Sequence, residues 1–156
     1  LLRDFPDGLL VEQLLPGREV TVGVLGNGPD ARALAVMEVV WTDRAETSAY
    51  TSLNKDEYLD RVEYRLVDGD ALADEAAGLA LAVALTLECG DAARVDLRCD
   101  AAGRLAVLEV NPLPGLHPVR SDLPIMARLA GVDYDRLLGQ IVDAAAARNG
   151  LCGRAA

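Results

Sequence analysis

The sequence has few of the side chains that most often mark catalytic or metal centres. It contains one histidine, one lysine and three cysteines in 156 residues. Cys89, Cys99 and Cys152 are odd in number and have no CxxC spacing, which argues against a disulfide framework or a zinc site and favours a reducing, cytoplasmic location. His117 has no Ser, Cys or Asp partner placed to form a catalytic triad. We therefore interpret it as a loop histidine.

Positive charge and long apolar runs are also scarce. The formal net charge of −10 argues against nucleic acid and anionic membranes as partners, since both are polyanions. The longest uncharged apolar run, 76–87, is shorter than the roughly 18–20 residues that span a bilayer. The sequence shows no basic segment followed by an apolar one, so it does not predict a signal peptide. Because the first residue is leucine and not methionine, we expect either that a segment was processed off or that the chain is the downstream part of a longer protein.

The pattern along the chain predicts one α+β domain over residues 1–150 and a short tail, 151–156. We expect a mostly antiparallel sheet with helices packed on one face. The polar stretch 42–60 has no steady period, and a loop of this length is usually functional or disordered. Strands are predicted over 8–13, 19–25, 32–40, 61–67 and both arms of 94–111, and helices over 70–89, 121–131 and 133–148.

The most informative segment is RVDLRCDAAGRLAVLEVNPLPG, residues 94–115. It reads as a hairpin with a turn at 100–103 in which Asp100 faces Gly103. Alternation then places Arg94 opposite Glu109 and predicts a polar face made of Arg94, Asp96, Val107, Glu109 and Asn111. The residues expected to face the core are Val95, Leu97, Leu108 and Val110. A three-residue turn would break this parity.

Two carboxylates and an amide oxygen on one face form a hard, oxygen-only ligand set. Such a set suits Mg²⁺ or Mn²⁺ with phosphate oxygens and water completing the coordination. The guanidinium of Arg94 beside it suits a planar anion. The alternative is a surface ion pair between Arg94 and Glu109, which would contribute less than about 1 kcal/mol. Spacing alone leaves both interpretations open.

The motifs RVDL and LEVNPLPG of this hairpin resemble the metal-binding end of ATP-grasp enzymes, and most closely the D-alanine–D-alanine ligase family. VEQLLPGREVTV, at 11–22, resembles the adenine hinge of that family and the strand after it. SDLPIMARLAG, at 121–131, and the segment after it resemble the closing helices. The resemblance covers about nine tenths of the chain and implies the carboxy-terminal portion of an ATP-grasp domain.

The resemblance implies roles at the reacting end of the site. Arg94 matches the arginine that holds a substrate carboxylate and stabilises the tetrahedral intermediate. Gly115 matches a glycine whose backbone N–H meets the developing oxyanion, and Ser121 matches a residue that contacts the carboxylate of the second amino acid. The residues that match ligands of two Mg²⁺ ions on the β- and γ-phosphates of ATP are Asp96, Glu109 and Asn111.

It implies further roles at the nucleotide end. Glu19 matches the carboxylate that binds the ribose hydroxyls. Lys55, the single lysine, matches a mobile-loop lysine that reaches the γ-phosphate, which agrees with the stretch 42–60 as an active-site lid. The residues that match the adenine hinge are Glu12, Gln13 and Leu15.

The implied function is that of an ADP-forming carboxylate–amine ligase of peptidoglycan or peptide biosynthesis. ATP converts a carboxylate into an acyl phosphate, which an amino-acid amine then attacks. Gln13, Asp56 and Asp122 depart from the family pattern, so the resemblance indicates an amino acid or dipeptide substrate without specifying D-alanine.

The amino-terminal substrate domain and the first phosphate-binding strands of the family have no counterpart in the sequence. We therefore expect the chain to need that missing part as a partner and to be inactive alone. The alternative is a non-catalytic truncated module that binds nucleotide or dimerises, and a homodimer is possible in either case.

Overall fold

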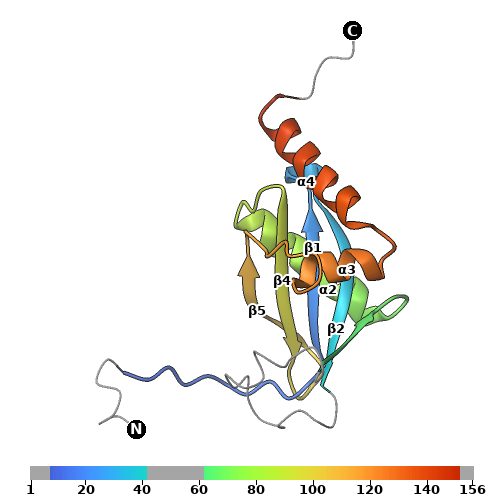
Figure 1. The fold of residues 1–156 in the computed structure, drawn as a ribbon. Helices are drawn as coiled ribbons and strands as arrows, with labels where there is room; N and C mark the ends of the chain where they lie inside the picture. Colours follow the sequence, from blue (N-terminus) through green and yellow to red (C-terminus); the bar gives the residue numbers. More distant parts are fainter. Residues whose placement is uncertain (1–7, 42–61, 152–156) are drawn as a thin grey trace.

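The computed structural model describes residues 8–41 and 62–151, which form an antiparallel five-stranded sheet with helices against it (Figure 1). The strand order is β3-β2-β1-β4-β5. This confirms the predicted α+β class and antiparallel sheet. The strands are β1 (Glu19–Leu25), β2 (Arg32–Trp41), β3 (Val62–Leu66), β4 (Ala92–Cys99) and β5 (Leu105–Asn111). The helices are the 3-10 turn η1 (Gly28–Asp30), α2 (Ala71–Thr86), α3 (Asp122–Leu129) and α4 (Tyr134–Arg148).

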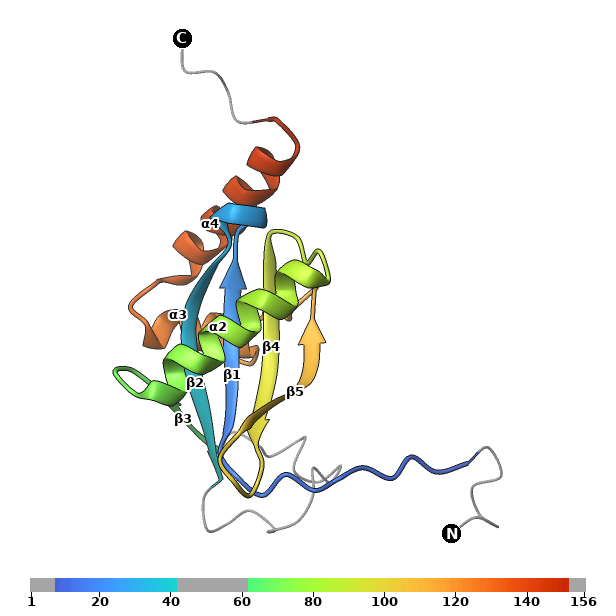
Figure 2. The same cartoon turned by 180° about the vertical axis from the view of Figure 1, so that it is seen from behind.

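Helices cover both faces of the sheet, so the prediction that they pack on one face is wrong. Figure 2 shows α2 crossing one face, and Figure 1 shows α3 and α4 on the other. The reason lies in β1, because the residues that face either side of the sheet in this strand are buried. Val20, Val22 and Val24 pack toward α2, while Gly23 and Leu25 lie under α3 and α4.

Helix α2 begins where the sequence predicts. Asp70 caps it, accepting a hydrogen bond from the backbone N–H of Leu72 at 3.1 Å. The helix ends at Thr86, three residues before the predicted end. Its buried side is a stripe of small side chains, which allows close approach to the valines of the sheet. That stripe consists of Ala73, Ala76, Ala80 and Ala84.

The segment before β1 is not a strand, so the predicted strand over 8–13 is wrong. Its apolar side chains are exposed: Leu10 is 84 %, Val11 88 % and Leu14 78 % exposed. Figures 1 and 2 show this segment running away from the sheet. A strand needs a paired neighbour for its backbone groups, and no described strand lies beside it.

The β4–β5 hairpin has a different turn from the predicted one. The N–H of Asp100 donates to the carbonyl of Arg104 at 2.9 Å, which leaves a three-residue loop. Gly103 closes this loop with a φ of +80°, a conformation that glycine adopts without a steric penalty. From Cys99 to Leu97 the pairing therefore differs by one residue from the predicted register.

A β-bulge then restores the parity that this turn would have broken. Leu97 pairs with Val107, but Asp96 pairs with Glu109, so Leu108 is an extra residue on β5. Val107 consequently packs toward α2, and Leu108 is 51 % exposed, the reverse of the faces predicted for these two. The four polar residues of the motif remain together on one face.

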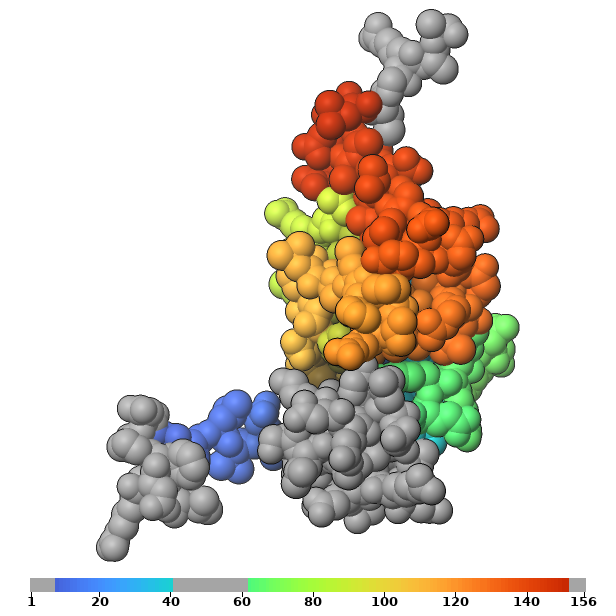
Figure 3. All heavy atoms as spheres, in the orientation of Figure 1, coloured from blue at the N-terminus to red at the C-terminus, as the bar shows by residue number. Residues whose placement is uncertain are grey.

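The connection from β5 to α3 lies at the surface against the last two helices (Figure 3). Tyr134 donates from its hydroxyl to the carbonyl of Leu116 at 2.8 Å, and Arg128 donates to the carbonyl of Pro118 at 3.4 Å. These bonds fix the loop that carries Gly115. Within the described residues, no helix is long and apolar enough to cross a bilayer.

Candidate functional site

Three rows of residues run across β1, β4 and β5 on the sheet face that carries α3, and most of their side chains are polar. Because side chains alternate along a strand, neighbouring rows are about 7 Å apart. The strand pairings and bulge set these rows. They are Gly23, Arg94 and Asn111; then Thr21, Asp96 and Glu109; then Glu19, Arg98 and Ala106.

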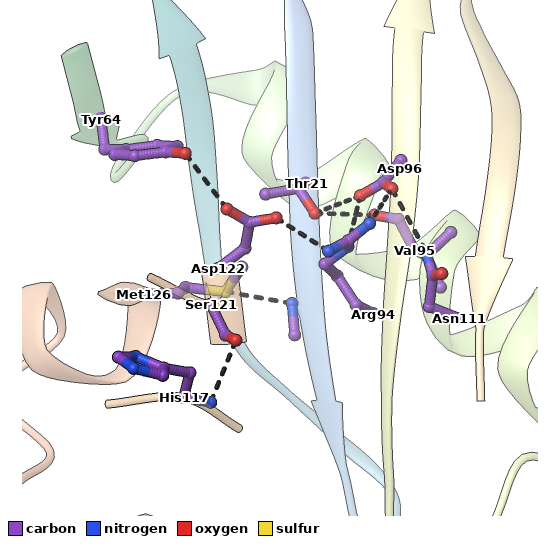
Figure 4. A network of polar contacts seen from close by, with 11 residues as sticks. Thr21, Tyr64, Arg94, Val95, Asp96, Asn111, His117, Ser121, Asp122 and Met126 are labelled. Atoms are coloured by element: carbon purple, nitrogen blue, oxygen red, sulfur yellow. Dashed lines mark hydrogen bonds and ion pairs between the residues drawn. The ribbon is translucent and has the colours of Figure 1, made fainter. Parts of the chain in front are cut away.

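Arg94 is the centre of a hydrogen-bonded network (Figure 4). Its Nε and Nη2 donate to the two carboxylate oxygens of Asp96 at 3.0 and 2.8 Å. Its Nη1 donates to Asp122 Oδ2 at 2.8 Å, and the Tyr64 hydroxyl donates to Asp122 Oδ1 at 3.2 Å. Thr21, the one buried polar residue among the described residues, donates to Asp96. Four elements, β1, β3, β4 and α3, thus contribute to fixing one guanidinium.

The predicted pairing of Arg94 with Glu109 is corrected by the bulge, since Arg94 lies opposite Asn111 and Asp96 opposite Glu109. With the Asn111 amide nitrogen toward Glu109, Nδ2 donates to Glu109 Oε1 at 2.9 Å and Oδ1 accepts from Arg94 Nη2 at 3.0 Å. The reverse orientation keeps only a 3.3 Å bond to Asp96 and faces like groups to each other. We therefore assign the first orientation.

The surroundings in this network favour the charged form of Arg94 and disfavour the charged form of Asp122. Burial lowers the pKa of Arg94, but hydrogen bonds to Asp96 and the charges of Asp96, Asp122 and Glu109 outweigh it and raise the pKa. Burial raises the pKa of Asp122, and Arg94 and Tyr64 offset this only in part. Arg94 therefore stays charged, while the charge on Asp122 is incompletely compensated by its neighbours.

Asp96, Glu109 and Asn111, the predicted metal ligands, lie in adjacent rows and in contact through the Asn111 amide. Their oxygens suit a hard divalent cation. Arg94 and Thr21 already engage Asp96, so Glu109, which is exposed, is the more open carboxylate. Over residues 8–41 and 62–151 there is no group of three or more His, Cys, Asp and Glu side chains that could hold a metal. A cation bound here would need the Asn111 amide oxygen in addition to the carboxylates, and further ligands from outside the described residues.

Gly115 and Ser121 are brought together at the Arg94 end of the network. A Cβ on Gly115 would lie 2.7 Å from Ser121 Oγ, so a larger residue there would force the Ser121 side chain to shift. Ser121 Oγ accepts from the backbone N–H of His117 at 3.0 Å. His117 Nδ1 accepts from two backbone N–H groups of the same loop, which confirms it as a loop histidine.

The last row joins Glu19, the predicted ribose ligand, to a residue that the sequence interpretation missed. Arg98 donates from Nη1 to Glu19 at 3.1 Å, while its Nε is buried and has no hydrogen-bond partner in the described structure. The spacing of Arg94, Asp96 and Arg98 could have identified it, because alternate residues of a strand share a face.

The predicted adenine hinge joins the sheet at this same end. Glu12 and Gln13 are exposed and Leu15 is half-buried, and none has a described contact with the polar rows. The N–H of Gly17 donates to the carbonyl of Cys99 at 3.0 Å, which holds the end of the segment beside the last row. Lys55 and the predicted lid lie outside the described residues.

Tyr64 and Asp122 were also missed as site residues. Asp122 was noticeable only as a departure from the family pattern, and Tyr64 has no local signal. Both belong to the network because β3 and α3 come together in the fold. Their sequence separation from Arg94 hides that contact.

Comparison with known proteins agrees with this architecture. A family model described as "D-ala D-ala ligase C-terminus" matches residues 2–143. A D-alanine–D-alanine ligase of Bordetella petrii is 37% identical over 146 residues, covering 92% of this chain and 43% of that protein. One of Frankia casuarinae is 32% identical over 139 residues, covering 86% of this chain and 35% of that protein.

Solved structures show the same fold. A D-alanine–D-alanine ligase from Coxiella burnetii has a TM-score of 0.68 and 22% identity, covering 89% of this chain and 34% of that one. One from Bacillus anthracis, complexed with ATP, has a TM-score of 0.67 and 24% identity, covering 91% and 42%. The chain spans less than half the length of these relatives. The match over nearly its whole length shows that it belongs to the D-alanine–D-alanine ligase carboxy-terminal family, as the hairpin motifs predicted.

Proposed function

We propose that this chain supplies the nucleotide-, metal- and carboxylate-binding part of an ADP-forming carboxylate–amine ligase. The observation that carries the proposal is the order of the three rows. Glu19 lies in one outer row, Asp96 and Glu109 in the middle, and Arg94 in the other outer row. That is the order of ribose, phosphates and acceptor carboxylate in a bound ATP and its substrate.

In this proposal Asp96, Glu109 and Asn111 hold Mg²⁺ or Mn²⁺, which when bound neutralises charge on the transferring phosphoryl group. Arg94 binds and orients a substrate carboxylate with charge-assisted hydrogen bonds. Gly115 would offer its backbone N–H to the developing oxyanion, and Ser121 would meet the second amino acid. The approach of the Ser121 hydroxyl to Gly115 supports placing both roles at one end of the site.

The remaining roles rest on the family resemblance. Glu12, Gln13 and Leu15 would meet adenine, Glu19 the ribose and Lys55 the γ-phosphate. The substrate is an amino acid or dipeptide. The partner is the missing amino-terminal part of the ligase, because residues 1–150 form a partial ATP-grasp domain. The location is the cytoplasm. We expect no ligase turnover from these 156 residues alone.

Calorimetric titration with Mg-ATP tests the proposal. We expect saturable binding by the chain, a loss of roughly tenfold or more in affinity for Glu109→Ala, and no loss for Glu75→Ala. Glu75 is an exposed carboxylate on α2, on the opposite face of the sheet, and its removal changes the net charge equally. Equal binding by all three proteins would remove the metal-site claim. Amino-acid-dependent ADP formation by the chain alone would contradict the expected lack of turnover.

The second candidate is a nucleotide-binding or dimerising module without catalysis. Sedimentation of the chain with and without Mg-ATP separates the two. The module is supported if the chain dimerises with Mg-ATP and no ADP forms when an amino-terminal part is added.

A further inference from the structure

Asp122 is hydrogen-bonded to Arg94 Nη1, the guanidinium nitrogen that Asp96 and Asn111 leave for an incoming carboxylate. A guanidinium has five N–H donors, and a carboxylate is best bound by two of them along one edge. Asp96 takes the Nε–Nη2 edge, and Asn111 takes a second Nη2 donor. Asp122 takes one of the two Nη1 donors. The second N–H of Nη1, on the nitrogen that Asp122 already binds, has no acceptor in the part of the chain that the structure describes.

Asp122 is not needed to hold the guanidinium in place. Asp96 already binds Arg94 through two parallel hydrogen bonds, and both side chains are about four-fifths buried, at 21 % and 22 % exposed. The Asp122 side chain is 28 % exposed, so it is the more accessible of the two carboxylates on Arg94. Its effect is therefore mainly to add negative charge at the open side of the guanidinium.

The charge balance at this point disfavours an anionic ligand. Asp96, Asp122 and Glu109 all act on Arg94, and three carboxylates against one guanidinium leave an excess of negative charge. Burial of Asp122 is only partly offset by Arg94 and Tyr64. Each of its oxygens accepts one described hydrogen bond and retains a lone pair for another donor. A positively charged group placed against Asp122 would complete its compensation.

We propose that Asp122 makes this end of the site selective for a zwitterion, whose carboxylate takes the free N–H of Arg94 Nη1 while its ammonium group lies against Asp122. The inference rests on the proposed role of Arg94 as a carboxylate-binding residue. It assigns to Asp122 the discrimination between an amino acid with an unblocked ammonium group and a simple carboxylic acid of the same size. Asp122 is the specificity-determining residue.

Alanine and propionate test this directly, because they differ only in the ammonium group. Binding of each is followed by NMR titration of the chain, through the Arg94 Nε–H signal and the backbone amides of Gly115 and Ser121. We expect the wild-type chain to bind alanine more tightly than propionate by on the order of tenfold, which corresponds to about 1.4 kcal/mol. Asp122→Asn should reduce this ratio to near one, mainly because propionate binds more tightly.

Three further variants separate charge from structure. Asp143→Asn removes the same charge from an exposed position on α4 and should keep the ratio. Asp122→Glu should also keep it, and serves if the asparagine variant folds poorly. Tyr64→Phe removes a hydrogen bond to Asp122 but not its charge, so the ratio should persist. A loss in Tyr64→Phe as large as in Asp122→Asn would overturn the inference in favour of a structural role.

The outcomes also separate this inference from the proposed function. A ratio in the wild-type chain that does not change in Asp122→Asn overturns the inference alone. Binding of Mg-ATP without binding of either small ligand overturns it together with the carboxylate role of Arg94. Absence of both kinds of binding overturns the proposed function itself.

Discussion

Gly23→Ala is the substitution whose cost the structure defines most closely. Gly23 lies in β1 beneath α3, and its N–H donates to Met126 Sδ at 3.1 Å. A Cβ built there would lie 2.8 Å from Leu123 Cδ1 and 3.0 Å from Met126 Sδ. Leu123 and Met126 are both fully buried, so neither can move aside into solvent. The added methyl group must therefore displace α3 or force side chains from their rotamers.

Overpacking of this kind costs about 1–3 kcal/mol, and the lower chain entropy of alanine in the unfolded state offsets about 0.4–1 kcal/mol. We expect a net loss of about 1–2 kcal/mol in the free energy of unfolding. For a chain of this size that corresponds to a decrease in Tm of roughly 2–8 °C. Because α3 carries Asp122, we also expect a smaller preference for alanine over propionate at Arg94.

Urea unfolding followed by circular dichroism measures the change, and Gly78→Ala is the matched control. Gly78 lies within α2 with nothing within 4 Å of a built Cβ, so alanine there should stabilise the protein by about 0.5–1 kcal/mol. The two variants make the same chemical change with opposite expected signs. If Gly23→Ala is as stable as Gly78→Ala, the packing of α3 on β1 described above is incorrect.

Three other substitutions test the packing and the charge pairs of the protein. Gly115→Ala should weaken amino-acid binding measured by NMR with little change in Mg-ATP affinity, because its Cβ would meet Ser121 Oγ at 2.7 Å. Met126→Ala should lower the free energy of unfolding by about 2–5 kcal/mol, since it leaves a cavity under α3. The hydrogen bond from Arg148 lowers the pKa of Asp91, so the stability it contributes is present above the unfolded pKa of about 3.9 and is lost as pH falls through the lower folded value. Asp91→Asn should flatten that acid decline in urea titrations, and an unchanged decline would assign it to other carboxylates.

Much of the fold could be predicted because it depends on local patterns. Alternation identified β1 with the bounds that the structure shows, and Asp70 and Asp133 were correctly predicted as helix caps. The strand expected over 8–13 has the right composition but no strand to pair with among the described residues. Composition reports only a preference, whereas a ladder requires a partner.

The grouping of the four polar residues on one face was predicted for a reason that was partly wrong. The sequence suggested a two-residue turn and a regular hairpin, and each of these is incorrect. The three-residue turn and the bulge at Leu108 offset each other, so Glu109 and Asn111 still face the same way as Asp96. Neither feature has a distinctive local sequence. The bulge depends on packing Val107 against α2 while keeping the polar residues out of the core.

Contacts between distant segments could not be predicted at all. Asp122 is 28 residues from Arg94, and Tyr64 is 58 residues from Asp122. No periodicity links such positions, since only the packing of α3 over β1 and β2 brings them together. The contact of Asp122 with Arg94 is therefore a property of the fold and not of the hairpin motif.

The central claim is that the middle row holds a metal–nucleotide next to Arg94, and paramagnetic broadening by Mn-ATP tests it most directly. The account predicts that the Asn111 side-chain amide and the Arg94 Nε–H broaden first. The amide of Gly78, on the opposite side of the sheet, should stay sharp, and Glu109→Ala should abolish the effect. Broadening spread over the acidic surface, or unchanged by Glu109→Ala, would contradict the assignment of this face as the nucleotide and metal site.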